Sequence, residues 1–186
     1  MQAFLKQNAV LNLISKNDEK FLWEKHIFDS LAIEKFFDKY GKAKTLLDIG
    51  TGGGFPAVPV ALAYPEIQVT AVDSIRKKIN AIENIKEELQ INNLKTICDR
   101  VENIKDKYDI ITSRAVASLD KICGYALPLL KKDGYFVAYK SRKTPEELNS
   151  AEKVLKKYNS KTVDIIEYQL PLDETFIRNL IIIKRY

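Results

Sequence analysis

The stretch "LLDIGTGGGFP", residues 46–56, decides the fold of this chain. Its first half is an apolar run that predicts a short strand, and its second half is a glycine-rich turn. The following segment "AVPVALAY", residues 57–64, predicts a helix. Glycines at alternate positions let the backbone turn sharply and approach a ligand closely. These glycines are Gly50, Gly52 and Gly54. A strand, a glycine turn and a helix in this order predict a ligand-binding loop at the edge of an α/β sheet.

The glycine spacing distinguishes between two kinds of ligand. A dinucleotide fingerprint requires a third glycine at the position that Phe55 occupies. The pattern Asp-x-Gly-x-Gly-x-Gly, which begins at Asp48, is instead typical of the first motif of Rossmann-like S-adenosylmethionine (SAM) methyltransferases. We expect Asp48 to position the amino-acid end of SAM or the loop itself, and Phe55 to pack on the ligand. A glycine turn that binds nothing is the less favoured alternative.

Alternating strand and helix patterns continue on both sides of this loop. Strands are predicted at 45–49, 67–73, 95–98, 108–113, 134–139, 161–168 and 178–186. Helices are predicted at 3–38, 57–64, 74–90, between the fourth and fifth strands, and at 145–157. This alternation predicts an α/β fold with a mostly parallel seven-stranded sheet, an antiparallel C-terminal strand and preceding N-terminal helices. We expect a single domain over residues 1–186, with a helical extension at 1–40 and a Rossmann-like core at 45–186.

Ligands of such sheets bind beyond the carboxyl ends of the strands, so residues that directly follow strands are the site candidates. Asp73 ends the second strand, where an acid can accept hydrogen bonds from both ribose hydroxyls. A helix cap near Ser74 is its competing role. Val101 and Glu102 follow the third strand, where an apolar wall and an acceptor for the adenine amine are needed.

Composition narrows the classes of function. The chain has 186 residues, of which 46% are hydrophobic, and no apolar run is long enough to cross a bilayer. With one histidine and two distant cysteines, Cys98 and Cys123, we expect no zinc site and no disulfide. The net charge of +5 permits nucleic-acid binding. We expect a cytoplasmic monomer without a membrane or metal partner.

Two groups of nucleic-acid methyltransferase are disfavoured by what is missing. Adenine-amine methyltransferases carry Asn/Asp-Pro-Pro-Tyr/Phe after the fourth strand, where this chain has "TSRAVA", residues 112–117. Cytosine-C5 methyltransferases need a thiol nucleophile in a Pro-Cys or Thr-Cys pair. Both cysteines of this chain follow isoleucine.

Several short motifs together resemble one family, the bacterial 16S ribosomal RNA guanine-N7 methyltransferases, also called the glucose-inhibited division protein B family. The matching pieces are "NLIS" (12–15), "KHIFDSL" (25–31), "LLDIGTGGGFPAVPVAL" (46–62), "VDSIRKKINAI" (72–82), "DRVENI" (99–104), "TSRAVASL" (112–119) and "AYKS" (138–141). They occur in the family's order, and the resemblance beyond residue 145 is generic. The N-terminal region looks short for the family, and Gly53 stands where relatives often have proline or alanine.

The resemblance implies a reaction, a cofactor and a partner. It implies SAM-dependent methylation of one guanine N7 in 16S rRNA, with the rRNA or the small ribosomal subunit as partner. Carried over by motif position, Gly50, Phe55, Val101, Glu102 and Arg114 are SAM contacts. Guanine N7 carries no proton at neutral pH, so the attack on the methyl group needs alignment and no general base.

The resemblance also places a substrate cleft. It implies cleft positions for His26, Asp29 and Ser30, and Ser113 at the end of the fourth strand is a further candidate for substrate binding. Lys140, which follows the fifth strand, and Arg142 can hold phosphates. A structural role for the histidine group, and a solvated surface role for Lys140 and its neighbour Arg142, are the alternatives.

Arg114 is the most unusual of the candidates, because it is a permanent cation beside a cationic cofactor. It can reach the SAM carboxylate or the target nucleotide, or it can form an ion pair with Glu102 or Asp48. Together with His26 it is the candidate for a positioning role. The bare fold also permits a methyltransferase for another RNA, a small molecule or a protein, or a non-catalytic nucleotide-binding module.

Overall fold

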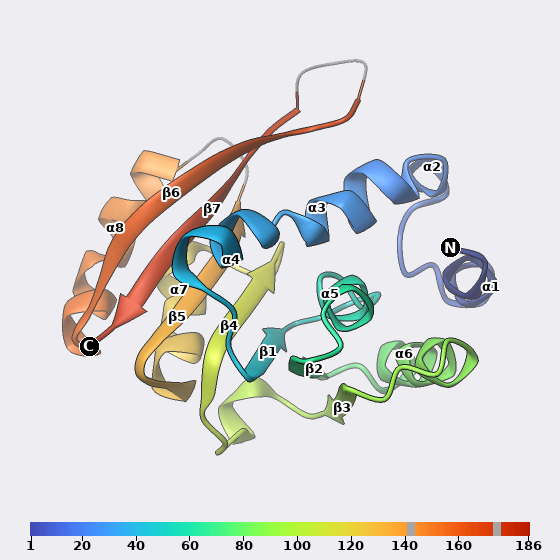
Figure 1. Ribbon diagram of the computed structural model, residues 1–186, viewed down its shortest axis with the longest axis horizontal. Helices are drawn as coiled ribbons and strands as arrows, with labels where there is room; N and C mark the ends of the chain where they lie inside the picture. Colours follow the sequence, from blue (N-terminus) through green and yellow to red (C-terminus); the bar gives the residue numbers. More distant parts are fainter. Residues whose placement is uncertain (141–143, 173–175) are drawn as a thin grey trace.

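A computed structural model (Figure 1) describes residues 1–140, 144–172 and 176–186, with side chains described from residue 146 onward in the second range. Its centre is a seven-stranded sheet with the order β3-β2-β1-β4-β5-β7-β6. The strands are β1 (Thr45–Ile49), β2 (Gln68–Asp73), β3 (Leu94–Cys98), β4 (Tyr108–Arg114), β5 (Leu130–Lys140), β6 (Ser160–Leu170) and β7 (Phe176–Arg185). The first five strands pair in parallel, and β7 is antiparallel to both β5 and β6. The predicted fold class is therefore confirmed.

Helices cover both faces of the sheet (Figure 1). The helices α4 (Glu34–Tyr40), α5 (Ala57–Ala63) and α6 (Arg76–Glu88) contribute to one apolar cluster, and α7 (Leu119–Ala126) and α8 (Thr144–Lys157) contribute to the other. Successive residues of β1 point to opposite faces, so Leu46 belongs to the first cluster and Leu47 to the second. Burial on both faces explains why this strand reads as a continuous apolar run.

The N-terminal region is helical in pieces, and the prediction of helix throughout residues 3–38 was wrong. It consists of α1 (Gln2–Leu11), α2 (Lys16–Glu19), a π-helix η1 (Trp23–Phe28), α3 (Asp29–Leu31) and α4. Asn12 ends α1 with a left-handed φ of 48°. Ser15 then caps α2 by accepting a hydrogen bond from the Asp18 backbone N–H at 3.1 Å. The apolar spacing continues through this break, which is why periodicity did not reveal it.

The fifth strand begins four residues earlier than the predicted start at residue 134. Its added residues Lys131, Lys132 and Asp133 are exposed, and Asp133 has a φ of 62°. Two short 3₁₀ helices, η2 (Val101–Asn103) and η3 (Leu127–Leu129), complete the described elements. Arg142 lies outside the described residues. In the described parts of the chain, no helix combines the length and the apolar character needed to cross a membrane.

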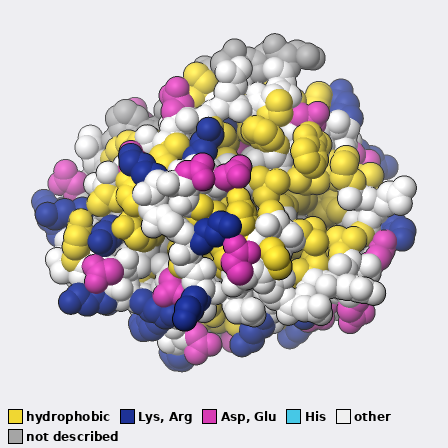
Figure 2. Space-filling model, in the orientation of Figure 1, with side chains coloured by type: hydrophobic (Ala, Val, Ile, Leu, Met, Phe, Trp, Pro, Cys, Tyr) yellow, Lys and Arg dark blue, Asp and Glu magenta, His cyan; other side chains and the backbone are white. Residues whose placement is uncertain are grey.

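The surface in the orientation of Figure 1 mixes charges of both signs. Lysine, arginine and acidic side chains intermingle over the visible face (Figure 2). The net charge of +5 is thus not gathered into one basic field on this face. An anionic partner would therefore be bound on this face by individual lysine or arginine side chains, and not by a continuous basic surface.

The order of the strands locates the site. From β1 the chain crosses to β2 on one side, and later returns to β4 on the other side of β1. The carboxyl ends of β1 and β4 therefore flank the point where strand order reverses, and ligands bind at this crevice in open α/β sheets.

Candidate active site

Two cavities open at the carboxyl ends of the parallel strands, and Ala115 belongs to the walls of both. The first, here called the glycine-loop cavity, has a volume of about 460 Å³ and includes Gly50, Asp73, Val101 and Glu102 in its wall. The second, here called the arginine cavity, has a volume of about 530 Å³. Its lining includes Asp18, Lys25, His26, Asp29, Arg114, Tyr139, Lys140, Glu147, Phe176 and Arg178.

Asp73 holds the glycine loop in place. Its Oδ2 accepts a hydrogen bond from the Gly52 backbone N–H at 3.0 Å, and its Oδ1 accepts one from the Ile75 N–H at 2.9 Å. The second bond forms a turn that leads into α6, but the N-cap of that helix is Ile75 and has no side-chain cap, so neither Asp73 nor Ser74 has the capping role considered as an alternative. An ionised carboxylate has about four acceptor sites, which leaves Asp73 free to accept further bonds from a ligand in the cavity.

Gly50 is required by space as well as by conformation. Its φ is +67°, a left-handed value that side chains rarely adopt. A Cβ atom on this residue would lie 2.5 Å from Cγ2 of Val116. Gly50 and Val116 therefore bring the loop after β1 and the turn after β4 together at the mouth of the glycine-loop cavity.

Asp48 lies beneath the glycine loop and lines neither cavity. Its side chain is fully buried, and Oδ1 accepts a hydrogen bond from the Thr112 hydroxyl at 2.9 Å. Burial raises the pKa of Asp48 to about 6, against the opposing effect of the nearby Thr51 and Thr112 hydroxyls. The Thr51 hydroxyl is near enough to the Asp48 carboxylate to lower its pKa, but it forms no hydrogen bond with Oδ2. Oδ2 has no hydrogen-bond partner among the described residues. This position suits the loop-positioning role better than direct contact with a ligand.

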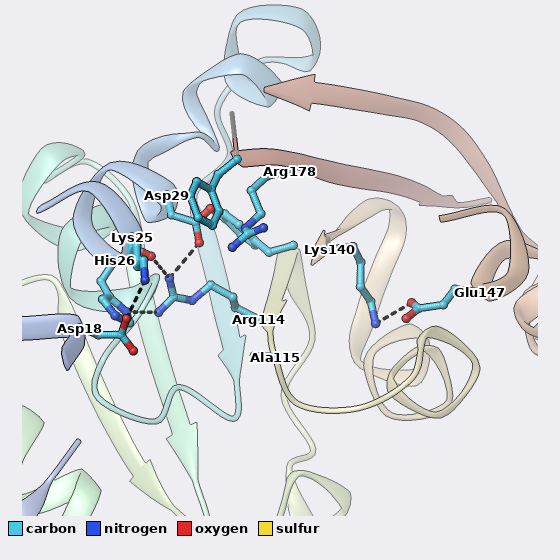
Figure 3. A pocket seen from close by; sticks show the side chains of 11 residues that line it. Asp18, Lys25, His26, Asp29, Arg114, Ala115, Lys140, Glu147 and Arg178 are labelled. Atoms are coloured by element: carbon cyan, nitrogen blue, oxygen red, sulfur yellow. Dashed lines mark hydrogen bonds and ion pairs between the residues drawn. The ribbon is translucent and has the colours of Figure 1, made fainter. Parts of the chain in front are cut away.

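Arg114 turns away from the glycine-loop cavity and holds the N-terminal helical region. Its Nη1 donates to Asp29 Oδ2 at 2.9 Å and to the Lys25 carbonyl at 3.1 Å (Figure 3). The guanidinium carbon lies 5.4 Å from the centre of the Phe55 ring. The side chains of Arg114 and Asp29 are 16% and 7% exposed, so the pair is largely buried. The ion pair considered with Glu102 or Asp48 is thus formed with Asp29 instead.

A π-helical turn lies where Arg114 meets the N-terminal helical region. A π-helix bonds each carbonyl to the residue five positions on, and its wider turn disturbs the regular hydrogen-bond ladder. The carbonyl of Lys25 lies in this turn and accepts from Arg114. Asp29 follows the turn, and its Oδ1 accepts a hydrogen bond from the Tyr168 hydroxyl at 2.7 Å. Burial, then the Asp29 carboxylate, raises the pKa of Tyr168, which keeps this hydroxyl a donor.

His26 joins the same network through one ring nitrogen. Its Nδ1 lies 3.1 Å from Nη2 of Arg114, and its ring centre lies 5.2 Å from that of Phe55. Burial, followed by the positive charge of Arg114, lowers the pKa of His26 to about 4. The imidazole is therefore neutral at physiological pH.

The other predicted site residues are placed as follows. Val101 and Glu102 line the glycine-loop cavity, and Lys140 lines the arginine cavity. Lys140 also pairs with Glu147 at 2.7 Å and donates to the Ala117 carbonyl at 2.9 Å. The structure does not bring the remaining predicted residues to either wall. These are Ser30, Gly52, Gly54, Phe55 and Ser113.

Each of these five residues has a supporting position, and Gly52 has its own through the backbone N–H that donates to Asp73 Oδ2. The Ser30 hydroxyl donates a hydrogen bond to the His26 carbonyl. Gly54 packs so closely against Val58 that a Cβ atom on it would lie 2.7 Å from the Val58 side chain. The Phe55 ring packs behind His26 and against Phe4, with ring centres 4.9 Å apart in the second pair. Burial of Ser113 at the end of β4 likewise keeps it from the cavity.

Sequence reasoning missed Arg178, Lys25, Asp18 and Glu147. Arg178 lies near the start of β7, the antiparallel strand. An antiparallel strand begins at the edge where its parallel neighbours end, so a cation ahead of the apolar run "NLIII" was a usable signal. Lys25 and Asp18 form an ion pair at 2.9 Å that spans the break between helices, and no local pattern indicates that contact.

Comparison with known proteins identifies the family. The family model GidB, described as rRNA small subunit methyltransferase G, matches residues 1–175. The chain belongs to this family. Two relatives named ribosomal RNA small subunit methyltransferase G illustrate the similarity. The one from Bacillus licheniformis is 36% identical over 96% of this chain and 76% of its own length. The one from Microcystis aeruginosa is 38% identical over 97% of this chain and 85% of its own length.

Solved structures show the same fold at low sequence identity. TYW2 from Pyrococcus horikoshii, in complex with MeSAdo, superposes with a TM-score of 0.66 at 13% identity over 87% of this chain and 62% of that chain. Magnesium protoporphyrin IX methyltransferase from Synechocystis, with bound SAM, gives 0.66 at 14% identity over 86% and 79%. The architecture is therefore that of SAM-dependent methyltransferases.

A first prediction concerns the charge state of His26. Its pKa in the folded protein, about 4, lies below the ordinary value of 6.5, so the unfolded chain binds the proton more readily. Stability contributed by the neutral ring is present above pH 6.5 and is lost as pH falls toward 4. We expect the free energy of unfolding of the wild type, minus that of His26→Gln, to decrease over this interval in urea titrations.

Two neighbouring effects are controlled in that comparison. Asp48, whose folded pKa is raised, changes stability in the opposite direction between pH 3.8 and about 6, but it is present in both proteins and cancels. The charges that face His26 are Asp18, Asp29, Lys25 and Arg114, and they are also common to both. A difference that stays constant from pH 7 to pH 4 would show that His26 titrates normally.

Proposed function

We propose that this chain transfers the methyl group of SAM to N7 of a guanine in 16S rRNA, by direct in-line displacement without a general base. Family membership supports rRNA of the small subunit as the acceptor class. The fold supports SAM as the methyl donor. The choice of N7 and of a base-free transfer is supported by the residues of the arginine cavity.

The glycine-loop cavity has the features that SAM requires. Asp73 presents a carboxylate for the ribose hydroxyls, and Val101 with Glu102 offers an apolar surface and an acceptor for adenine. The left-handed Gly50 opens the space between the loop and Val116. SAM supplies an electrophilic methyl group on a sulfonium, and the residues of this cavity bind and orient it.

One observation carries the base-free reaction: every carboxylate in the described wall of the arginine cavity is paired with a cation. Asp18 pairs with Lys25 at 2.9 Å, Asp29 with Arg114 at 2.9 Å, and Glu147 with Lys140 at 2.7 Å. The Nδ1 atom of His26 faces the Arg114 guanidinium. These groups are poor proton acceptors, which disfavours acceptors that must lose a proton. Guanine N7 has a free lone pair and fits such a cavity.

Arg178 provides the remaining cation of the arginine cavity. Among the described residues it forms no ion pair, and its guanidinium makes only a long contact of 3.5 Å with the Ile177 carbonyl. Three other cations of the wall, Lys25, Arg114 and Lys140, are matched by three acids. An arginine beside a substrate cavity can bind a phosphate in a bidentate manner. We assign Arg178 to a backbone phosphate of the acceptor RNA.

The decisive experiment maps N7-methylguanosine in 16S rRNA with and without the gene. Reduction with borohydride and cleavage with aniline mark this base, and primer extension locates the break. We expect a stop in rRNA from the parent strain that disappears on deletion and returns with the wild-type gene. A stop that persists without the gene would exclude the proposal. Methylation of another RNA, a small molecule or a protein by the purified chain would replace it.

A second prediction tests the cofactor site with two glycines. Gly50→Ala forces a side chain into left-handed backbone and toward Val116, and we expect SAM affinity to fall on the order of tenfold or more. The matched control is Gly124→Ala, because Gly124 lies in α7 and an added Cβ would meet nothing within 4 Å. Titration calorimetry with SAM measures both. Equal affinity for the two variants would contradict the placement.

A third prediction concerns Arg178. Arg178→Ala removes a charged hydrogen bond to RNA, so we expect the KM for the rRNA substrate to rise by about tenfold with little change in SAM affinity. The slope of log KM against log salt concentration should fall by about 1. Lys153→Ala is the matched control, because it removes one charge from an exposed position on α8. An unchanged salt slope would show that Arg178 touches no phosphate.

A further inference from the structure

The turn between β4 and α7, residues 115–118, forms a wall that the two cavities share. Ala115 lines both cavities, and its φ of 56° is a left-handed value that side chains rarely adopt. Val116 follows it in the wall of the glycine-loop cavity and lies directly against Gly50. Backbone in such a conformation persists only where its surroundings hold it. The shape of the glycine-loop cavity therefore depends on the contacts that fix this turn.

Lys140, at the end of β5, makes one of these contacts. Its Nζ donates a hydrogen bond to the Ala117 carbonyl at 2.9 Å. The strand register explains why the lysine reaches this carbonyl. Tyr139 pairs with Arg114 across β5 and β4, so the next residue of β5 lies beside the turn that follows Arg114.

The surroundings of the Lys140 amine distinguish between its possible roles. A solvated lysine would be largely exposed, but this side chain is only 15% exposed. Its amine also has two partners within the protein, the Ala117 carbonyl and the Glu147 carboxylate (Figure 3). A charged hydrogen bond that is shielded from water is stronger than a neutral one. Lys140 is therefore placed to stabilise the turn, and the phosphate role assigned to Arg178 does not require its amine.

The opposite end of the turn is held independently. Arg114, the last residue of β4, is fixed by its ion pair with Asp29 at 2.9 Å. Ala115 and Val116 thus lie between two anchored points, Arg114 and the Ala117 carbonyl. Loss of the second anchor would let Ala115 relax toward the right-handed region of backbone conformation. Val116 would then move within the wall of the glycine-loop cavity.

We propose that Lys140 is a positioning residue for the methyl donor. Its bond to the Ala117 carbonyl holds Ala115 and Val116 in the conformation that completes the wall of the SAM site. The inference rests on the part of the proposed function that places SAM in the glycine-loop cavity. It goes further by naming a residue of the neighbouring arginine cavity that sets the affinity for SAM. It does not depend on which acceptor receives the methyl group.

The test combines loss of the lysine with relief of the backbone strain. Lys140→Met keeps an unbranched side chain of similar length and removes the amine. It is made in the wild-type chain and in the chain that carries Ala115→Gly. Glycine adopts a left-handed φ without steric cost, so this second background no longer needs the anchor. Titration calorimetry with SAM gives the affinity of all four full-length proteins.

In the wild-type background we expect Lys140→Met to weaken SAM binding by about tenfold. In the Ala115→Gly background the same change should weaken it by about twofold or less. Lys140→Arg keeps a charged donor and should retain most of the wild-type affinity. If the amine served only to bind a phosphate of RNA, Lys140→Met would leave SAM affinity unchanged in both backgrounds. That result would overturn the inference.

Two variants control for the loss of charge and for the ion pair. Lys156→Met removes a lysine of α8 that is 80% exposed and paired with Glu152, so SAM affinity should stay at the wild-type value. Glu147→Gln removes the ion pair of Lys140 but leaves the Ala117 carbonyl as an acceptor. It should weaken SAM binding less than Lys140→Met does. Thermal unfolding of each variant separates a general loss of stability from a loss of SAM affinity.

Other results would also contradict the role of Lys140. An equal loss of affinity from Lys140→Met in both backgrounds would show that the strained turn is not what the lysine holds. A loss in Glu147→Gln as large as that in Lys140→Met would assign the effect to the ion pair. If Lys140→Met does not fold, its combination with Ala115→Gly decides the question. SAM binding close to that of the wild type would then support the inference, and weak binding or failure to fold would overturn it.

Gly50→Ala distinguishes a failure of this inference from a failure of the proposed SAM site. If Gly50→Ala weakens SAM binding and Lys140→Met does not, SAM lies in the glycine-loop cavity and only the role of Lys140 is wrong. If neither change weakens SAM binding, the placement of SAM in that cavity is itself wrong.

Discussion

The buried ion pair between Arg114 and Asp29 is the interaction on which the site depends. It joins the end of β4 to the N-terminal helical region at 2.9 Å, and Tyr168 extends it to β6. A buried charge that loses its partner is strongly destabilising, because its desolvation is no longer compensated. The pair therefore holds three distant parts of the chain in one arrangement. His26 and the carbonyl of Lys25 complete that arrangement by facing the same guanidinium.

This pair also determines what chemistry the arginine cavity can support. Arg114 binds the Asp29 carboxylate and faces Nδ1 of His26. Both groups are therefore poor proton acceptors. A permanent cation at the end of β4 would obstruct an enzyme that must deprotonate an amine. It suits a nucleophile whose lone pair is already free, and alignment is then the main task of the protein. The charge of Arg114 is balanced within the protein by Asp29, so a cationic cofactor bound at this edge of the sheet would meet a neutral pair.

The sheet and the glycine loop could be predicted from the sequence, because each depends on a local pattern of residues. An apolar run such as residues 45–49 predicts a strand in any chain. A glycine such as Gly50, which has a left-handed φ, predicts a sharp turn. The partner of Arg114 did not follow, because Asp29 lies 85 positions away and no periodicity joins the two. Arg178 was missed although the cation ahead of an apolar run was visible, because its place at the site follows only when the antiparallel direction of β7 is taken into account.

The turn after β4 shows how the two cavities are tied to one another. Ala115 has a φ of 56°, a left-handed conformation that costs a residue with a side chain about 1 kcal/mol or more. Such strain persists only where the surroundings hold it. Arg114 is held on one side of Ala115 by Asp29, and the Ala117 carbonyl is held on the other by Lys140. Because Ala115 lines both cavities, this clamp sets the position of the shared wall. A shift of Lys140 or of the N-terminal helical region would therefore move the wall that the two cavities share.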